Sequence, residues 1–199
     1  MVSQTGRFKR LQQLSEGPYT ALTMRYARHY LADFPEHGPG WLLLGIALVE
    51  LARYAEAKQV LSRAIMLCPR EKLRIPLGHM GHLFQRSGEY EHAASWYRQA
   101  IASDPHVADN HIFLGAVLAK QGRLYDAEAA LRQAIDCVEG CIDEAYLNLG
   151  LVLRAQERFA EAADCFREAL QRDPHYRAAK RALRDVERCL RWLNTKSKD

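Results

Sequence analysis

The sequence has no long hydrophobic run. None of its apolar stretches approaches the roughly 20 residues that a membrane-spanning helix needs, so no transmembrane helix is expected. Residues 1–10 are polar and basic, and they contain no apolar core of the kind found in a secretory signal. Together these two absences favour a cytoplasmic protein.

Cysteine is scarce and irregularly placed. The chain has five cysteines among 199 residues, an odd number without the spacing of a disulfide framework. Free thiols in a reducing compartment are therefore expected. Cys137 and Cys141 lie four residues apart, but redox pairs use a Cys-x-x-Cys spacing beside a strand, so a packing role is favoured for both.

The sequence also lacks the motifs of common catalytic and metal sites. It contains no nucleophile–base–acid constellation, no phosphate-binding loop and no Gly-x-Gly-x-x-Gly fingerprint. His79 and His82 are three residues apart and His92 follows, yet no His-Glu-x-x-His or cysteine-paired pattern accompanies them. We therefore expect no enzymatic activity, no metal and no cofactor.

What the sequence does contain is an internal repeat over residues 38–176. Four columns of residues return in one register, at successive intervals of 36, 34 and 35 residues. The columns are a glycine (Gly45, Gly81, Gly115, Gly150), a first alanine (Ala57, Ala93, Ala127, Ala162), a large apolar residue (Leu61, Tyr97, Leu131, Phe166) and a second alanine (Ala64, Ala100, Ala134, Ala169). Independent columns that share one set of offsets indicate tandem structural units.

Each unit divides into two amphipathic segments of about three to four helical turns. In the first unit, Trp41, Leu44 and Leu48 share one face of such a helix. Glycine costs roughly 1 kcal/mol in a helix interior, so its return in one column predicts a place where two helices approach closely. Pro69 and Pro105 follow the second segments and end them, because proline does not continue a helix.

This pattern resembles the tetratricopeptide repeat (TPR) family. In the first unit the resemblance is carried by Trp41, Leu44, Gly45, Leu48, Tyr54, Ala57, Leu61, Ala64 and Pro69. Equivalent residues return in the other units, with two departures: Glu139 replaces the proline, and Glu157 stands where Gly88 and Gly122 mark the turn between helices. The resemblance implies an all-α, right-handed superhelical solenoid of tandem antiparallel helix pairs.

We predict a single TPR-like domain over residues 1–199. Its approximate units are 4–37, 38–71, 74–107, 108–141 and 143–176, followed by a capping helix over 177–193 and a polar tail over 194–199. The unit over residues 4–37 is degenerate, and Leu11, Thr23, Ala27 and Tyr30 fall in its columns. Terminal units of a solenoid are atypical because one face meets water. Small insertions near 70–73 and Gly140 are expected in loops.

In TPR proteins the first helices of successive units line a concave groove that binds peptides. The resemblance therefore implies the partner-binding residues Leu42, Ile46, Val49, His82, Arg86, Ile112, Ala116, Lys120, Leu147, Asn148, Leu151 and Arg154. This face is mainly apolar, and we expect it to hold a peptide or helix of another protein, with its basic residues favouring acidic flanks. The alternative is that Leu42, Ile46, Leu147 and Leu151 pack against neighbouring helices.

Some TPR domains bind the C-terminal carboxylate of chaperones through a clamp of lysines, asparagines and an arginine. Leu42 and Ile46 occupy positions of that clamp and are apolar. A chaperone-tail receptor of the clamp type is therefore disfavoured.

The charge of the chain is concentrated at one end. The whole chain has a net charge of +4, and residues 177–199 alone hold eight Lys and Arg against three Asp and Glu. The basic surface consists of Arg177, Lys180, Arg181, Arg184, Arg188 and Arg191. Such a stripe suits phosphate or an acidic partner, although charge runs are usually solvated surface, and a solvated cap is favoured.

The predicted function is a non-catalytic protein–protein interaction scaffold or adaptor. Two alternatives remain open at this point. One is a binder of anionic polymer or nucleic acid that acts through the basic C-terminal helix, with nucleic acid the less favoured partner. The other is a homo-oligomer in which a second copy fills the groove.

Overall fold

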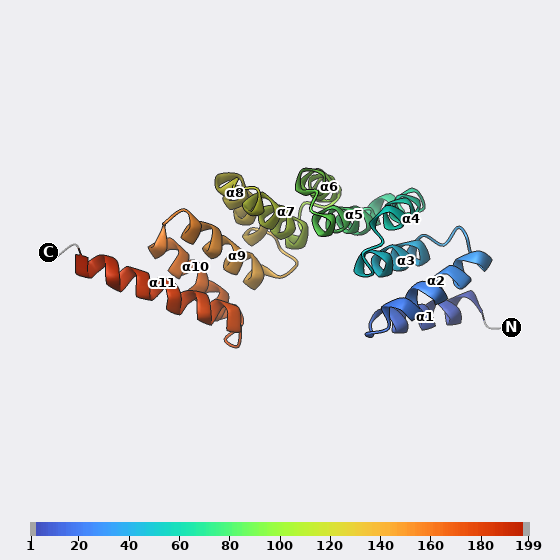
Figure 1. Cartoon of the computed structure of the whole chain (residues 1–199), viewed down its shortest axis with the longest axis horizontal. Coiled ribbons are helices and arrows are strands. Elements are labelled where there is room, and N and C mark those ends of the chain that lie inside the picture. Colours follow the sequence, from blue (N-terminus) through green and yellow to red (C-terminus); the bar gives the residue numbers. More distant parts are fainter. Residues whose placement is uncertain (1–2, 197–199) are drawn as a thin grey trace. The chain divides into compact units, whose positions relative to one another are not determined.

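The computed structural model describes residues 3–196 and is built from helices joined by short connections (Figure 1). The helices are α1 (Gln4–Ser15), α2 (Thr20–Asp33), α3 (Gly38–Glu50), α4 (Tyr54–Met66), the 3₁₀ turn η1 (Arg70–Lys72), α5 (Arg74–Ser87), α6 (Tyr90–Ser103), α7 (Ala108–Lys120), α8 (Leu124–Ile135), α9 (Ile142–Ala155), α10 (Phe159–Arg172) and α11 (Arg177–Lys196). Residues 3–196 contain no β-strand beyond an isolated bridge between Val107 and Glu139. The predicted all-α class is confirmed.

The chain divides into two compact units after Ser103. Unit 1 contains the hairpins α1–α2, α3–α4 and α5–α6, and unit 2 contains α7–α8, α9–α10 and the last helix, α11. Within each unit, consecutive helices lie side by side in pairs (Figure 1). The residues of the repeated alanine and large apolar columns are buried in the pairs from α3–α4 to α9–α10, so the sequence repeat becomes a repeat of packed hairpins.

The glycine column marks the closest contact within each hairpin. A methyl group added at Gly115 would lie 2.5 Å from Leu131 Cγ, and one added at Gly150 would lie 2.5 Å from Phe166 Cε1. Both distances are far below a van der Waals contact, and Leu131 and Phe166 are fully buried. The predicted role of the glycines in close helix approach is therefore confirmed, and the glycine and large apolar columns pack directly against each other.

The first hairpin keeps the same interior with the sizes exchanged. Leu11 occupies the glycine column and Ala27 occupies the large apolar column, while Tyr30 replaces the second alanine. All three side chains are fully buried. In this hairpin the large residue is on the first helix and the small one is on the second, whereas the other hairpins have the reverse. The two residues together fill a similar volume, so a hairpin with a poor sequence match retains the packing of the others.

The turn inside each later hairpin uses a left-handed residue. Gly88 and Gly122 have φ of 84° and 76°, as glycine readily adopts. The equivalent residues of the other two hairpins are Ala52, with φ of 55°, and Glu157, with φ of 64°. Side chains with a β-carbon are strained in this region, so Glu157 holds a backbone conformation that costs stability.

A buried carboxylate links two parts of unit 2, the helix α8 and the turn between α9 and α10. Glu128 on α8 accepts hydrogen bonds from Arg132 at 2.6 Å and from Arg158, at the start of α10, at 2.7 Å. Burial raises the pKa of Glu128, but the hydrogen bonds from Arg132, Arg158 and Gln156 outweigh burial and lower the pKa to about 2. The group is therefore ionised near neutral pH and ties α8 to the turn between α9 and α10.

The ends and insertions of the chain add detail to the predicted boundaries. The insertion near 70–73 forms η1, and Gly140 has φ of 104° in the connection before α9. Helix α11 extends to Lys196, three residues beyond its predicted end. Residues 1–2 of the predicted basic N-terminus and 197–199 of the predicted tail lie outside the described residues. No helix within 3–196 is long and apolar enough to cross a bilayer.

Replacing Glu157 with glycine is expected to stabilise the protein. Glycine removes the steric cost of the left-handed conformation, and part of that gain is lost to its greater freedom in the unfolded chain. We expect the free energy of unfolding to rise by about 0.5–1 kcal/mol, measured by urea denaturation. The control is Ala155→Gly in the last turn of α9, which should lower it; a loss of stability in Glu157→Gly would contradict the account of this turn.

Candidate functional site

Unit 2 brings three of the predicted groove residues together. Ala116 on α7 and Asn148 and Leu151 on α9 line one hollow of about 260 Å³, which we call the unit 2 hollow. Its remaining lining residues are Ala119, Leu124, Leu131, Val152 and Ala155. Asn148 is the one polar residue of this set, so the unit 2 hollow offers a single amide in an otherwise apolar surface.

Small side chains on α7 create the space for this hollow. The residue after the repeated glycine is Ile46, His82, Ala116 or Leu151, depending on the repeat. At Ala116 the side chain is only a methyl group, and Ala119 lies three residues further on the same helix face. Leu151 of α9 lines the space that these alanines leave.

The first turns of α7 and α9 lie together and are acidic. Asp109 of α7 accepts a hydrogen bond from the Cys141 N–H, just before α9, at 3.4 Å. Asp143 and Glu144 occupy the first turn of α9. Burial raises the pKa of Glu144, and the charges of Asp143 and Asp109 raise it further, whereas a hydrogen bond with Asn148 lowers it. Negative charge therefore collects at this end of the two helices.

The last turns of α7 and α9 are basic instead. They carry Lys120 and Arg154, of which Lys120 is exposed and Arg154 is partly buried. Among the described residues no carboxylate pairs with Arg154. A cation is favoured at the C-terminus of a helix, but here both cations also flank a partly apolar surface. A segment bound along these helices would thus meet negative charge at one end and positive charge at the other.

Unit 1 distributes its predicted groove residues over separate places. Leu42 lines an apolar hollow of about 170 Å³, together with Ile75 and Pro76 at the start of α5. Ile46 lines a different hollow of about 50 Å³ between α1–α2 and α3. His82 and Arg86 line neither of them. Unit 1 thus has no counterpart of the unit 2 hollow among these pockets.

Three predicted groove residues belong to the interior. Val49, Ile112 and Leu147 have exposed fractions of 2%, 1% and 7%. Ile112 lies in a buried cluster of unit 2 with Ala108, Ala134 and Ala145, as expected for a side chain that packs against neighbouring helices. By contrast, Leu42, Ile46 and Leu151 keep part of their surface accessible.

Burial shifts the pKa values of His79, His82, Cys137 and Cys141 away from their charged forms. Burial lowers the pKa of His79 to about 4, assisted by the charge of His82, and burial also lowers the pKa of His82. Cys137 and Cys141 are free thiols whose pKa is raised by burial and by nearby carboxylates. Within 3–196 no three His, Cys, Asp or Glu side chains are grouped to hold a metal ion.

The predicted basic surface lies on one helix. Arg177, Lys180, Arg181, Arg184, Arg188 and Arg191 are all exposed on α11. The opposite face of α11 buries Ala179, Ala182 and Val186. One face of this helix therefore packs on the unit, and the other presents the cations.

The hollow beside Leu42 was missed by sequence reasoning. Its wall is made by residues that follow the insertion, chiefly Ile75 and Pro76, and by Cys68 and Pro69 before it. The insertion itself is visible in the repeat spacing. The hollow itself cannot be recognised in the sequence, because it forms only when η1 turns the chain and places these side chains opposite Leu42.

Comparison with known proteins gives a consistent result. Models of the tetratricopeptide repeat match residues 39–71, 80–140 and 143–176. The chain is 30% identical over 131 residues to human tetratricopeptide repeat protein 7B, covering 66% of this chain and 15% of that protein. The chain therefore spans only a small part of that relative.

Solved structures share the fold at lower identity. MamA from Desulfovibrio magneticus RS-1 aligns with a TM-score of 0.70 and 17% identity, covering 89% of this chain and 99% of that one. The first TPR domain of Spaghetti (RPAP3), bound to the HSP90 peptide SRMEEVD, aligns with a TM-score of 0.56 and 20% identity, covering 59% of this chain and 92% of that one.

Substituting Leu147 and Leu151 with alanine, one at a time, should show which of the two side chains belongs to the core and which to the surface. Leu147→Ala removes a buried side chain and is expected to lower the free energy of unfolding by about 2–4 kcal/mol. Leu151→Ala removes a partly exposed one and should cost about 1 kcal/mol or less. Chemical denaturation of both variants tests the assignment, and equal losses would show that Leu151 is also part of the core.

Proposed function

Because the chain belongs to the tetratricopeptide repeat family, we propose that it is a non-catalytic scaffold that holds a peptide or helical segment of another protein. The binding surface consists of the exposed sides of α7 and α9 around the unit 2 hollow. One observation carries the proposal: Ala116, Asn148 and Leu151, which belong to two different repeats, converge on a single apolar hollow.

The chemistry of the unit 2 hollow suits an apolar side chain carried on a polypeptide backbone. Its walls of alanine, leucine and valine favour burial of an apolar group from the partner. The Asn148 amide has both donors and an acceptor, which suits a peptide group next to that side chain. A helix or peptide that lays an apolar side chain into a hydrophobic groove is one of the recurring modes of peptide recognition.

The charges at the two ends of the helices favour one orientation of the partner. An acidic flank of the bound segment would lie near Arg154 and Lys120, and a basic flank would lie near Asp143 and Glu144. The opposite orientation would place like charges together at both ends. Like-charge contacts across an interface are costly, so this arrangement gives polarity as well as affinity.

The relatives support the proposal at the level of the fold. The Spaghetti (RPAP3) domain with this fold holds a peptide, so a stack of such hairpins is able to accommodate a peptide. In the present chain the unit 2 hollow is lined by apolar side chains and the Asn148 amide, with no cation among its lining residues. We therefore propose an apolar or amphipathic segment as the partner, rather than a free C-terminal carboxylate.

Selection from a random displayed peptide library tests this proposal. Enriched peptides should contain an apolar residue with acidic residues on one side, and fluorescence anisotropy gives their Kd. Leu151→Glu places a charge in the unit 2 hollow and should weaken binding at least about 10-fold, equivalent to roughly 1.4 kcal/mol. Arg154→Gln should weaken binding less, with a smaller dependence on salt.

The matched control is Tyr125→Glu, which adds the same charge at an exposed side chain of α8 outside the hollow. This variant should bind the selected peptides as the wild type does. Circular dichroism and thermal melting establish that each variant is folded. Peptides that bind Leu151→Glu with unchanged affinity would rule out the unit 2 hollow as the binding surface.

A further inference from the structure

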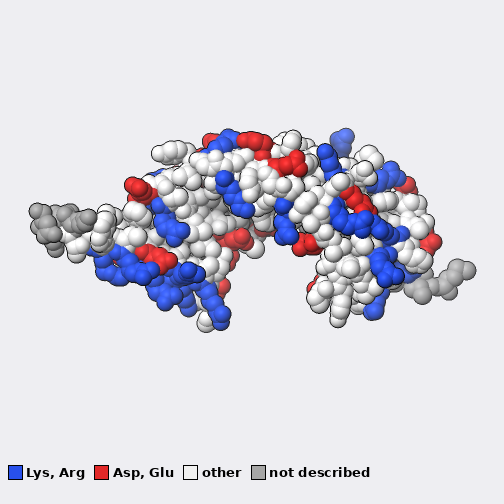
Figure 2. All heavy atoms as spheres, in the orientation of Figure 1, with Lys and Arg blue, Asp and Glu red and all other residues white. Residues whose placement is uncertain are grey.

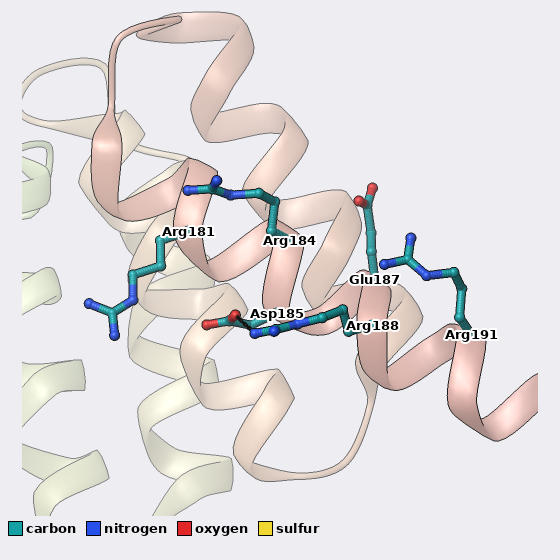
Figure 3. Close-up of a pocket in the computed structure, with 6 residues that line it drawn as sticks. All are labelled: Arg181, Arg184, Asp185, Glu187, Arg188 and Arg191. Atoms are coloured by element: carbon teal, nitrogen blue, oxygen red, sulfur yellow. Dashed lines mark hydrogen bonds and ion pairs between the residues drawn. The ribbon is translucent and has the colours of Figure 1, made fainter.

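The exposed face of α11 carries a continuous row of cations. Its members are Arg177, Lys180, Arg181, Arg184, Arg188 and Arg191, which we call the basic stripe. Successive members are one, three or four residues apart, so they share one side of the helix. At 1.5 Å per residue the stripe is about 21 Å long. Figure 2 shows blue side chains gathered over α11. Figure 3 shows four members of the stripe, Arg181, Arg184, Arg188 and Arg191, together with Asp185 and Glu187.

The basic stripe is hardly neutralised by the protein itself. Arg188 pairs with Asp185 at 2.5 Å, and the other carboxylate beside the stripe, Glu187, lies 3.5 Å from Arg167 of α10. Among the described residues, no ion pair involves the remaining five cations of the stripe. In Figure 3, Arg188 is joined to Asp185 by a dashed line, whereas Arg184 donates a hydrogen bond from its Nε to the Lys180 carbonyl oxygen at 3.3 Å.

The preceding helix shows the opposite arrangement. Arg158, Arg167 and Arg172, at the start, middle and end of α10, each contact a carboxylate one helical turn away. Opposite charges at this spacing stabilise a helix, and like charges at the same spacing destabilise it. The basic stripe places like charges three and four residues apart along its whole length, so the free protein is weakened by it.

The capping role of α11 does not require this stripe. Burial of Ala179, Ala182 and Val186 on the opposite face already joins α11 to the rest of unit 2. Polar residues of either sign on the outer face would keep it soluble equally well. An arrangement that costs stability and is unnecessary for packing is expected where a ligand supplies the missing negative charge.

The charge of the rest of unit 2 limits what this ligand is. Residues 104–199 contain 15 Lys and Arg against 16 Asp and Glu, and without the stripe the balance is 9 against 16. A nucleic acid that spread over unit 2 would therefore meet mostly negative charge. Asp185 and Glu187 also flank the stripe on its two sides. From Arg177 to Arg191 no aromatic residue lies between the cations to stack on bases, and the exposed Trp192 lies beyond the last of them.

A bilayer is also disfavoured as the partner. Helices that lie in a membrane interface insert their apolar face between the lipids. In α11 that face is buried within the protein at Ala179, Ala182 and Val186, and the exposed large apolar residues, Trp192 and Leu193, are confined to its C-terminal end. The narrow stripe instead suits one polypeptide segment, and guanidinium groups bind carboxylates in a planar, bidentate geometry.

We propose that the basic stripe of α11 docks an acidic segment of another protein, with Asp and Glu on one side at intervals of about one helical turn. Carboxylates three and four residues apart on an acidic helix have the same axial spacing as the cations of the stripe. This second surface lies on a different helix from α7 and α9 of the unit 2 hollow. It therefore extends the proposed function without depending on it.

The test uses two labelled 16-residue peptides of identical composition. In the first, glutamates occupy one helical face among alanines; in the second, the same glutamates are distributed around the helix. Fluorescence anisotropy with the full chain at 50 mM and 150 mM salt should give at least 10-fold tighter binding for the one-sided peptide, weakening as salt increases. Equal binding of the two peptides, or no binding at 50 mM salt, would overturn the proposal.

Substitution of three unpaired arginines locates the binding. Arg181→Gln, Arg184→Gln and Arg191→Gln together should weaken binding of the one-sided peptide at least 10-fold while leaving the melting temperature equal or higher, because like-charge repulsion is reduced. The matched control changes the net charge equally in unit 1, with Arg25→Gln, Arg70→Gln and Arg98→Gln, and should bind as the wild type does. Unchanged binding by the first variant, or an equal loss in the control, contradicts the proposal.

Two further measurements distinguish binding at the basic stripe from binding at the unit 2 hollow and from nucleic-acid binding. Leu151→Glu should bind the one-sided peptide normally, because the unit 2 hollow is not involved. A single-stranded oligonucleotide of the same charge should bind more weakly than the one-sided peptide; tighter binding would reject an acidic protein segment in favour of nucleic acid.

If the triple variant does not fold, Arg184→Gln with Arg191→Gln replaces it, and the affinity for the one-sided peptide is then expected to fall by a few fold.

Discussion

The contact between a glycine on the first helix of a hairpin and a large apolar side chain on the second is the constraint on which this structure depends. At Gly115 and Gly150 there is no room for even one methyl group against Leu131 and Phe166. Because glycine is unfavourable within a helix, these positions keep it only where the tight contact is worth more. The distance between the two helices is set there in the four hairpins from α3–α4 to α9–α10, and the alanine columns complete the buried seam.

That seam also decides which side chains remain available for binding. A residue that follows the glycine lies about 100° further round the helix, and so it points away from the second helix of its own hairpin. Ala116 and Leu151 hold this position in two adjacent hairpins of unit 2, and both line the unit 2 hollow. The position of the glycine on the helix thus determines both which side chains pack inside the hairpin and which side chains are available for binding outside it.

Much of the fold was predictable from the sequence, because its signals are local and repeated. The spacing of the glycine, alanine and large apolar columns predicts helix pairs and the side that each helix buries. The first hairpin is harder to recognise, because Leu11 and Ala27 exchange sizes across the seam. A residue-by-residue match penalises such an exchange, although the volume they fill together is preserved.

The candidate site was only partly predictable, since exposure depends on neighbouring hairpins. Helix periodicity places Leu147 and Leu151 four residues apart and close together on α9, yet Leu147 is buried and Leu151 lines the unit 2 hollow. The difference arises from where adjacent helices cover α9, which no column of one repeat encodes. The hollow beside Leu42 likewise depends on the path of η1. The basic stripe on α11 was visible as composition, but side-chain positions were required to show that, within the described residues, only Arg188 of its six cations forms an ion pair.

A double-mutant cycle at Gly115 and Leu131 tests the central contact most directly. In the wild type, Gly115→Ala should lower the free energy of unfolding by about 1–2 kcal/mol, because overpacking exceeds the gain in helix propensity. In the Leu131→Ala background the space is open, so the same substitution should raise it by up to about 1 kcal/mol. A reversal of sign supports the account, and an equal effect in both backgrounds would contradict it.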